Sequence, residues 1–193
     1  MKAVLLSIKP KYCELIERGE KTIELRKSEP KLKPPFKCYI YESKSFLPNK
    51  RYSAKTWARS GKVIGEFICD KIYHYTADYY RSDYVESLMN ITDEEMEKGS
   101  CLSRSDMYAY EESDNNYKWG LLGWHISDLV IYDKPKELSE FYYPPDKYFE
   151  KNMCGGCPYD EATIDGEIMY GCEGKRPLIR PPQSWCYVEE QEA

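Results

Sequence analysis

The sequence contains no long hydrophobic run. Of its 193 residues, 41% are apolar, and no apolar stretch approaches the ~20 residues that span a membrane. The chain opens on a strand-like segment, Ala3–Ile8, and shows no charged-then-apolar leader, so a secretory signal is not expected. We therefore expect a cytoplasmic protein without a membrane partner.

Histidine is scarce, and the sequence has no internal repeat or low-complexity tract. Only two histidines occur, so imidazole chemistry has few candidates. His125, near the start of a predicted strand, is a candidate ligand-binding residue that would hydrogen-bond or transfer a proton. A lone histidine is more often structural, and that alternative stays open.

Charge is unevenly distributed along the chain. The net charge is −5, but residues 1–62 carry +10 and residues 63–193 carry −15. A globally acidic protein is a poor non-specific nucleic-acid binder. A basic N-terminal third can still present one positive face to a ligand, unless the two charge sets face each other and cancel.

The densest chemical signal follows the first predicted helix. Pro10 suits the first turn of a helix, and the apolar spacing up to Arg18 is helical. Gly19 suits the left-handed residue that ends a helix. Ile23 and Leu25 then alternate with polar residues, which predicts a strand that carries charged side chains.

This segment resembles the signature of ASCH domains, a branch of the PUA-like superfamily. The pattern Gly-x-Lys-x-x-Glu-x-Arg is filled by Gly19, Lys21, Glu24 and Arg26, and the lead-in Ser7–Pro10 is also similar. The resemblance implies an α+β fold: a PUA-like, mostly antiparallel β-barrel with flanking helices. It also implies a cleft that binds RNA or a nucleotide, lined by Lys21, Glu24 and Arg26.

The alternative is that these side chains form a ladder of exposed ion pairs, which contributes little to stability. Strict strand alternation places Glu24 and Arg26 on one face and Lys21 on the other. Lys21 can join them only if residues 20–22 form a turn or a bulge in place of a regular strand. We expect convergence, and we expect Lys21→Ala or Arg26→Ala to weaken binding while leaving the melting temperature nearly unchanged.

Further ligand-binding candidates surround the motif. Ser7 and Lys9 precede a helix N-terminus, a ready anion site, and Thr22 lies within the motif. Aromatic side chains can stack a base, and the candidates are Tyr41, Trp57 and Trp124. For Trp57, in a basic loop, a buried anchor is the favoured alternative.

We expect an ASCH domain over residues 1–145 and an extension over residues 146–193. Residues 78–114 are acidic and helical, and Thr92–Glu95 is a capping box, so they are expected to form a helical insert. By the same resemblance, to prophage-encoded ASCH proteins, Asp133–Phe141 is expected to be a short helix.

Eight cysteines without a signal peptide argue against a disulfide scaffold. Four lie near the C-terminus: Cys154, Cys157, Cys172 and Cys186. One CxxC pair with two further cysteines is consistent with a structural zinc site, although the spacing is looser than in a common zinc ribbon. Unliganded or disulfide-bonded cysteines and a redox CxxC remain alternatives.

Three functions stay open. The first is RNA or nucleotide binding, in a prophage-encoded regulator as the resemblance implies. The second is a small amidohydrolase or ribonuclease with Lys21 and Glu24 as catalytic residues; in related amidohydrolases the motif Lys is the base and a Thr occupies the position of Glu24. The third is a protein-interaction factor that uses the acidic insert or the tail.

Overall fold

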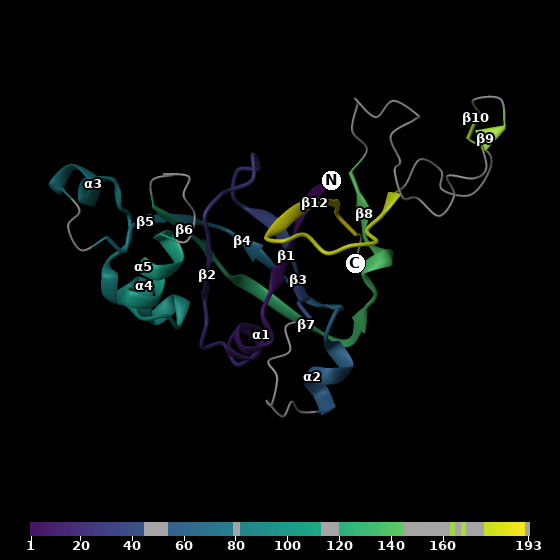
Figure 1. Cartoon of the computed structure of the whole chain (residues 1–193), viewed down its shortest axis with the longest axis horizontal. Helices are drawn as coiled ribbons and strands as arrows, with labels where there is room; N and C mark the ends of the chain where they lie inside the picture. Colours follow the sequence, from purple (N-terminus) through teal and green to yellow (C-terminus); the bar gives the residue numbers. More distant parts are fainter. Residues whose placement is uncertain are drawn as a thin grey trace.

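The computed structural model describes residues 1–44, 54–78, 82–112, 120–144, 163–164, 167–168 and 176–191. Its largest sheet has five strands in the order β12-β1-β3-β4-β7 (Figure 1). These strands are β12 (Trp185–Glu189), β1 (Lys2–Ile8), β3 (Phe36–Glu42), β4 (Val63–Cys69) and β7 (Ser127–Lys136). Only β1 and β3 run parallel within this sheet.

A second sheet of three antiparallel strands has the order β2-β6-β5. Its strands are β2 (Ile23–Arg26), β6 (Leu121–His125) and β5 (Ile72–Tyr75). Two short pairs complete the described strands: β8 (Tyr142–Tyr143) with β11 (Arg176–Pro177), and β9 (Thr163–Ile164) with β10 (Glu167–Ile168). The α+β class is confirmed, but the described strands form separate sheets that do not close, so the predicted barrel is not confirmed.

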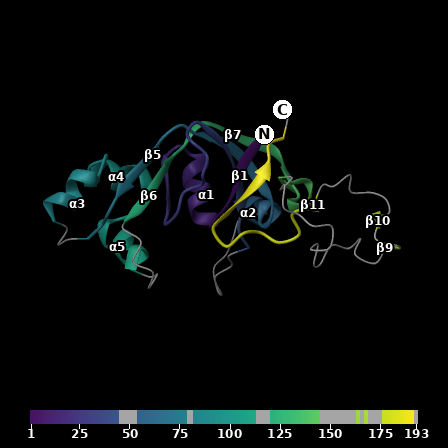
Figure 2. The ribbon, with the colours of Figure 1, turned by 90° about the horizontal axis from the view of Figure 1, so that it is seen from above.

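The helices lie at two places on this framework. Helix α1 (Pro10–Glu17) follows β1, and α2 (Ala54–Arg59) precedes β4. Helices α3 (Asp83–Leu88), α4 (Asp93–Ser100) and α5 (Arg104–Glu112) gather at one end of the molecule beside β5 and β6 (Figures 1 and 2). We call these three helices the helical lobe. No helix within the described ranges is both long and apolar enough to cross a membrane.

The capping box that opens α4 forms as the sequence predicts: Thr92 Oγ1 accepts from Glu95 N, and Glu95 accepts from Thr92 N. The predicted helix at Asp133–Phe141 is wrong, because β7 continues to Lys136 and only the 3-10 turn η1 (Leu138–Glu140) follows.

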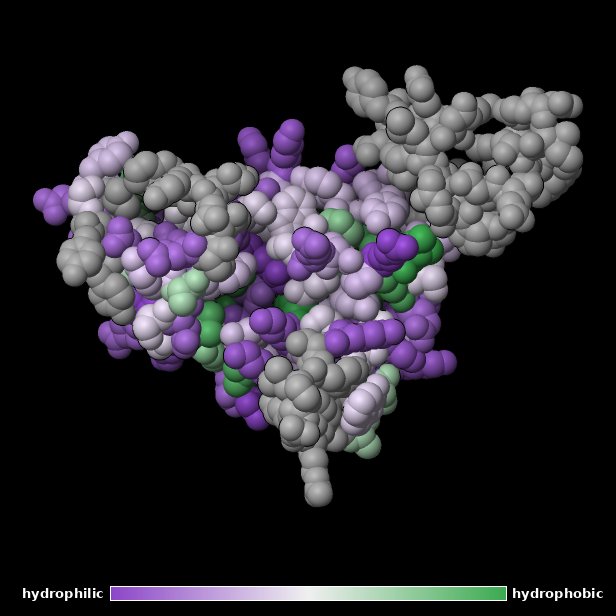
Figure 3. All heavy atoms as spheres, viewed as in Figure 1, coloured by the Kyte–Doolittle hydropathy of each residue, from purple (hydrophilic) through white to green (hydrophobic). Residues whose placement is uncertain are grey.

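The apolar core has parts on both faces of the five-stranded sheet, because alternate residues of β1 and β3 point to opposite sides. The inner core joins both large sheets and α1, and it contains Leu6, Cys13 and Trp124. The outer core, on the other face, contains Leu5, Tyr41 and Phe141. The described surface visible in Figure 3 is mostly hydrophilic, with small separate apolar patches.

Gly65 marks a close approach between two backbones. A Cβ atom at Gly65 would lie 2.4 Å from Val130 O, and the β4–β7 register shifts beside it. We expect Gly65→Ala to lower the free energy of unfolding by about 1–3 kcal/mol, measured by urea unfolding, because backbone must move. Val130→Ala, which trims a half-exposed side chain, is the control. A Gly65→Ala protein as stable as this control would contradict the close approach.

Candidate functional site

The turn after α1 decides where the motif side chains point. Gly19 adopts φ 71° and ends the helix, and the amides of Glu20 and Lys21 both donate to Leu15 O. Residues 20–22 therefore leave strand geometry, and β2 begins only at Ile23. The turn that Lys21 needs is present, so Lys21 joins the face of the strand that carries Glu24.

Lys21, Glu24 and Arg26, which we call the motif cluster, converge. Lys21 Nζ lies 3.4 Å from Glu24 Oε2, and Arg26 Nη2 lies 3.0 Å from Glu24 Oε1. The three side chains are only 1%, 9% and 7% exposed, in the order Lys21, Glu24, Arg26. The alternative of an exposed ion-pair ladder is therefore wrong. Because the charges are buried, we expect removal of one of them to lower the melting temperature, in place of the unchanged melting temperature that the sequence suggested.

Lys21 ties the motif to the helical lobe. Its ammonium donates to Ile23 O and Ser100 O, each at 2.8 Å, and Ser100 is the last residue of α4. The same group lies 5.2 Å from the centre of the Tyr12 ring, which favours a cation. The ammonium is therefore used as a donor on several sides.

Arg26 ties the motif to the first strand and the C-terminal tail. Nη2 donates to Ser7 O at 3.0 Å, and Nη1 donates to Ser184 Oγ at 3.3 Å. The tail is held in turn, since Ser7 N donates to Ser184 O and Ser7 Oγ donates to Pro182 O. Ser184, near the C-terminus, therefore reaches the motif cluster through its contact with Arg26.

Two donors near the motif cluster lack an acceptor. Arg26 Nε and Trp124 Nε1 are both buried, and neither has a hydrogen-bond partner in the part of the chain that the structure describes. The β2–β6 register places Trp124 directly opposite Glu24. Buried N–H groups without a partner are rare and costly, so this region can accept a ligand that brings hydrogen-bond acceptors.

The other predicted residues are less closely grouped. Ser7 joins through its carbonyl oxygen. Lys9 is exposed at the N-cap of α1, where its side chain makes no capping hydrogen bond, and Thr22 is exposed beside α4, where its amide donates to Gly99 O. Lys9 and Thr22 therefore lie close to the motif residues in the sequence, but their side chains do not join the motif cluster.

The aromatic candidates do not offer an open stacking surface at the motif. Trp124 is fully buried and packs edge-on against Phe36, and Tyr41 is 3% exposed in the outer core, on the far face of the sheet. Neither ring can stack a base in this structure. Trp57 is 58% exposed on α2, so its interpretation as a buried anchor is wrong.

His125 does not belong to the motif cluster. Its register partner is Ile23, so strand alternation turns its side chain away from the face that carries Glu24 and Trp124. His125 Nδ1 lies 2.6 Å from Asp70 Oδ1. The imidazole is thus engaged in a separate pair, as the structural alternative expected.

A second buried polar cluster was missed by the sequence analysis. Glu42, at the end of β3, is 0% exposed, and Arg59 Nε lies 2.7 Å from Glu42 Oε2. Arg59 Nη1 also donates to Glu17 at 2.7 Å. Burial raises the pKa of Glu42 to about 7, and Arg59 limits the rise. The sequence did contain a signal for this burial. Glu42 lies on the same face of the strand as the buried inner-core residues Cys38 and Ile40, because side chains alternate along a strand.

The zinc prediction is not tested by the structure. Cys154, Cys157 and Cys172 lie outside the described residues, and Cys186 lies in β12, partly buried against the outer core. Across the described ranges, no group of three or more His, Cys, Asp or Glu side chains could hold a metal. A structural zinc therefore stays a prediction.

Comparison with known proteins assigns the family. The chain is similar to two structures from Zymomonas mobilis. One is ASCH, 18% identical with TM-score 0.48 over 70% of this chain and 73% of that chain, and the other is a ZmASCH tyrosine-to-phenylalanine mutant, 17% identical with TM-score 0.48 over 72% of this chain and 77% of that chain. No curated protein matches the chain. The ASCH domain pattern matches residues 6–126, more than half of the sequence. The chain therefore belongs to the ASCH domain family.

Proposed function

We propose that this protein binds RNA or a nucleotide at the motif cluster. ASCH domains are generally thought to bind RNA. The observation that supports a site at this position is a pair of buried donors, Arg26 Nε and Trp124 Nε1, which have no hydrogen-bond partner among the described residues. A phosphate or a base edge supplies the acceptors that these donors lack.

The charge balance of the cluster favours an anionic or acceptor-rich ligand. Two cations, Lys21 and Arg26, share one carboxylate, Glu24, and all three are shielded from water. Such shielding strengthens their interaction with a bound charge. Ligand entry displaces the tail at Ser184, whose 3.3 Å contact is longer than the other two that hold the Arg26 guanidinium.

Binding is favoured over catalysis by the position of Lys21. A general base needs a free lone pair within reach of substrate. The Lys21 ammonium instead donates to two carbonyl oxygens at 2.8 Å and contacts Glu24. Glu24 also occupies the position at which related amidohydrolases carry a Thr hydroxyl.

Arg26→Lys tests the proposal with the charge retained. Lysine cannot reproduce the guanidinium fork, so we expect the dissociation constant for the tightest binder in a panel of short single-stranded RNAs and nucleosides to rise about tenfold. Arg18→Lys makes the same chemical change at an exposed residue and is expected to leave binding unchanged. Fluorescence anisotropy for RNAs and calorimetry for nucleosides provide the measurements.

Equal losses in the two variants would contradict a site at Arg26. The same assay separates binding from catalysis if single-stranded RNA and N4-acetylcytidine are recovered after incubation. Intact substrates support a binding module. Cleavage that the Lys21→Arg variant abolishes would replace this proposal with the hydrolase alternative.

A further inference from the structure

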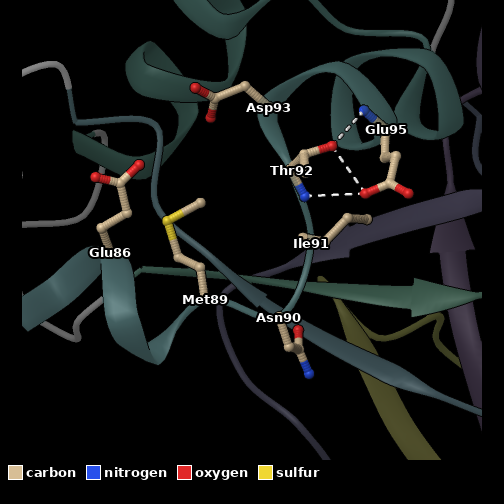
Figure 4. A pocket seen from close by; sticks show the side chains of 7 residues that line it. All are labelled: Glu86, Met89, Asn90, Ile91, Thr92, Asp93 and Glu95. Atoms are coloured by element: carbon tan, nitrogen blue, oxygen red, sulfur yellow. Dashed lines mark hydrogen bonds between the residues drawn. The ribbon is translucent and has the colours of Figure 1, made fainter.

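A groove lies between α3 and α4 in the helical lobe (Figure 4). Its volume is about 510 Å³. Met89 and Ile91, in the turn between the two helices, supply its apolar side chains. Both are partly buried against the apolar cluster that the helical lobe forms with the three-stranded sheet. Glu86, Asp93 and Glu95 add carboxylates from both helices.

The helix beside the groove carries unusually exposed apolar side chains. Tyr84 is 73% exposed and Leu88 is 58% exposed, although α3 has only six residues. Large apolar residues next to a groove with a methionine are typical of surfaces that adapt to a partner's side chains. The apolar groups of a partner's protein segment would cover these exposed side chains.

Charge identifies the kind of segment. Residues 82–112 contain nine acidic and two basic residues. Asp93 is partly neutralised by Arg104 at 3.0 Å, whereas Glu95 accepts from Thr92 and keeps its charge, and Glu94 is exposed on the same turn. A surface this acidic repels phosphate and attracts lysine and arginine.

We propose that this groove docks a Lys/Arg-bearing amphipathic segment of a partner protein. Apolar side chains of the segment cover Met89, Ile91 and Leu88, and its cations face Glu86 and the first turn of α4. Both elements of recognition are needed, since apolar contact supplies affinity and charge selects the partner.

This surface is separate from the motif cluster. The groove lies at the N-terminal end of α4, whereas Lys21 binds Ser100 O at the other end of that eight-residue helix. A helix of this length spans about 12 Å. A peptide in the groove therefore uses no side chain that the proposed RNA site uses.

The test measures binding of a fluorescent peptide of about 16 residues with Leu and Lys at helical spacing, against a peptide with Glu in place of Lys. We expect the full chain to bind only the Lys peptide. Glu86→Lys with Leu88→Ser should weaken binding at least tenfold. The control is Glu29→Lys with Val130→Ser, which makes the same changes in net charge and in exposed apolar surface away from the groove. This variant should leave binding unchanged.

Three results would overturn the docking proposal. They are no binding of the Lys peptide, equal loss in both double variants, and a wild-type dimer in sedimentation that Glu86→Lys with Leu88→Ser dissolves. The last would assign the groove to a second copy of this chain. RNA binding measured on the same variants stays unchanged if the two surfaces are independent, so either proposal can fail alone.

Discussion

Lys21→Met is expected to lower the free energy of unfolding by about 2–5 kcal/mol, because two buried carbonyl oxygens, of Ile23 and Ser100, lose their donor and Glu24 loses one of its two described cations. Methionine keeps the apolar length of the side chain but removes a cation that contacts Glu24 and donates to Ser100 O. Glu24 is then left with Arg26 as its one described cation. Urea unfolding followed by circular dichroism measures the loss. The slope of the free energy of unfolding against urea concentration should stay unchanged.

Lys55→Met is the matched control for this prediction. Lys55 also pairs with a glutamate, Glu17, but its side chain is 65% exposed. Exposed pairs contribute about 0–1 kcal/mol, so this variant should unfold close to the wild type. If Lys21→Met and Lys55→Met proved equally mild, the convergence of the motif cluster in a buried setting would be contradicted.

The local structure around the motif could be predicted from sequence because neighbouring residues determine it. Pro10 begins α1, Gly19 ends it with φ 71°, and β2 follows. The capping box at Thr92 is equally local. In each case backbone preferences of adjacent residues are sufficient, and no distant contact is required.

Burial of the motif cluster could not be predicted, because its partners are remote in sequence. Ser100 and Ser184, which contact Lys21 and Arg26, are 79 and 158 residues from them. The prediction that Tyr41 and Trp124 could stack a base failed for the same reason. Strand alternation shows only that each side chain points to one side of its strand. It does not show which side is covered by other strands. Both sides of β3 are covered, so Tyr41 is buried.

The second large effect is expected at Arg59. Arg59→Met should lower the free energy of unfolding by about 3–5 kcal/mol at pH 8, because a buried carboxylate loses its cation. The Arg59 side chain is 5% exposed and contacts both Glu42 and Glu17 at 2.7 Å. Neither Arg59 Nε nor Glu42 Oε2 completes a hydrogen bond in the described residues, so charge holds the pair.

Glu42 adds a pH dependence whose sign follows from its pKa. The folded pKa is raised to about 7 from an ordinary 4.5, so the folded state binds the extra proton between these values. The contribution of Glu42 to the free energy of unfolding is fully present below pH 4.5. It falls as the pH rises to 7 and is constant at higher pH. Glu42→Gln should abolish this fall, which amounts to about 3 kcal/mol, in urea unfolding across this range.

The double variant Glu42→Gln with Arg59→Met separates pairing from burial. If Arg59 acts by neutralising Glu42, the double variant is more stable at pH 8 than Arg59→Met alone, because no unpaired buried charge remains. Additive losses would contradict this coupling. A second contradiction would be an Arg59→Met loss that is equal at pH 5 and pH 8. At the lower pH Glu42 is protonated, so a loss through its charge must shrink there, whereas a loss through packing or Glu17 would persist.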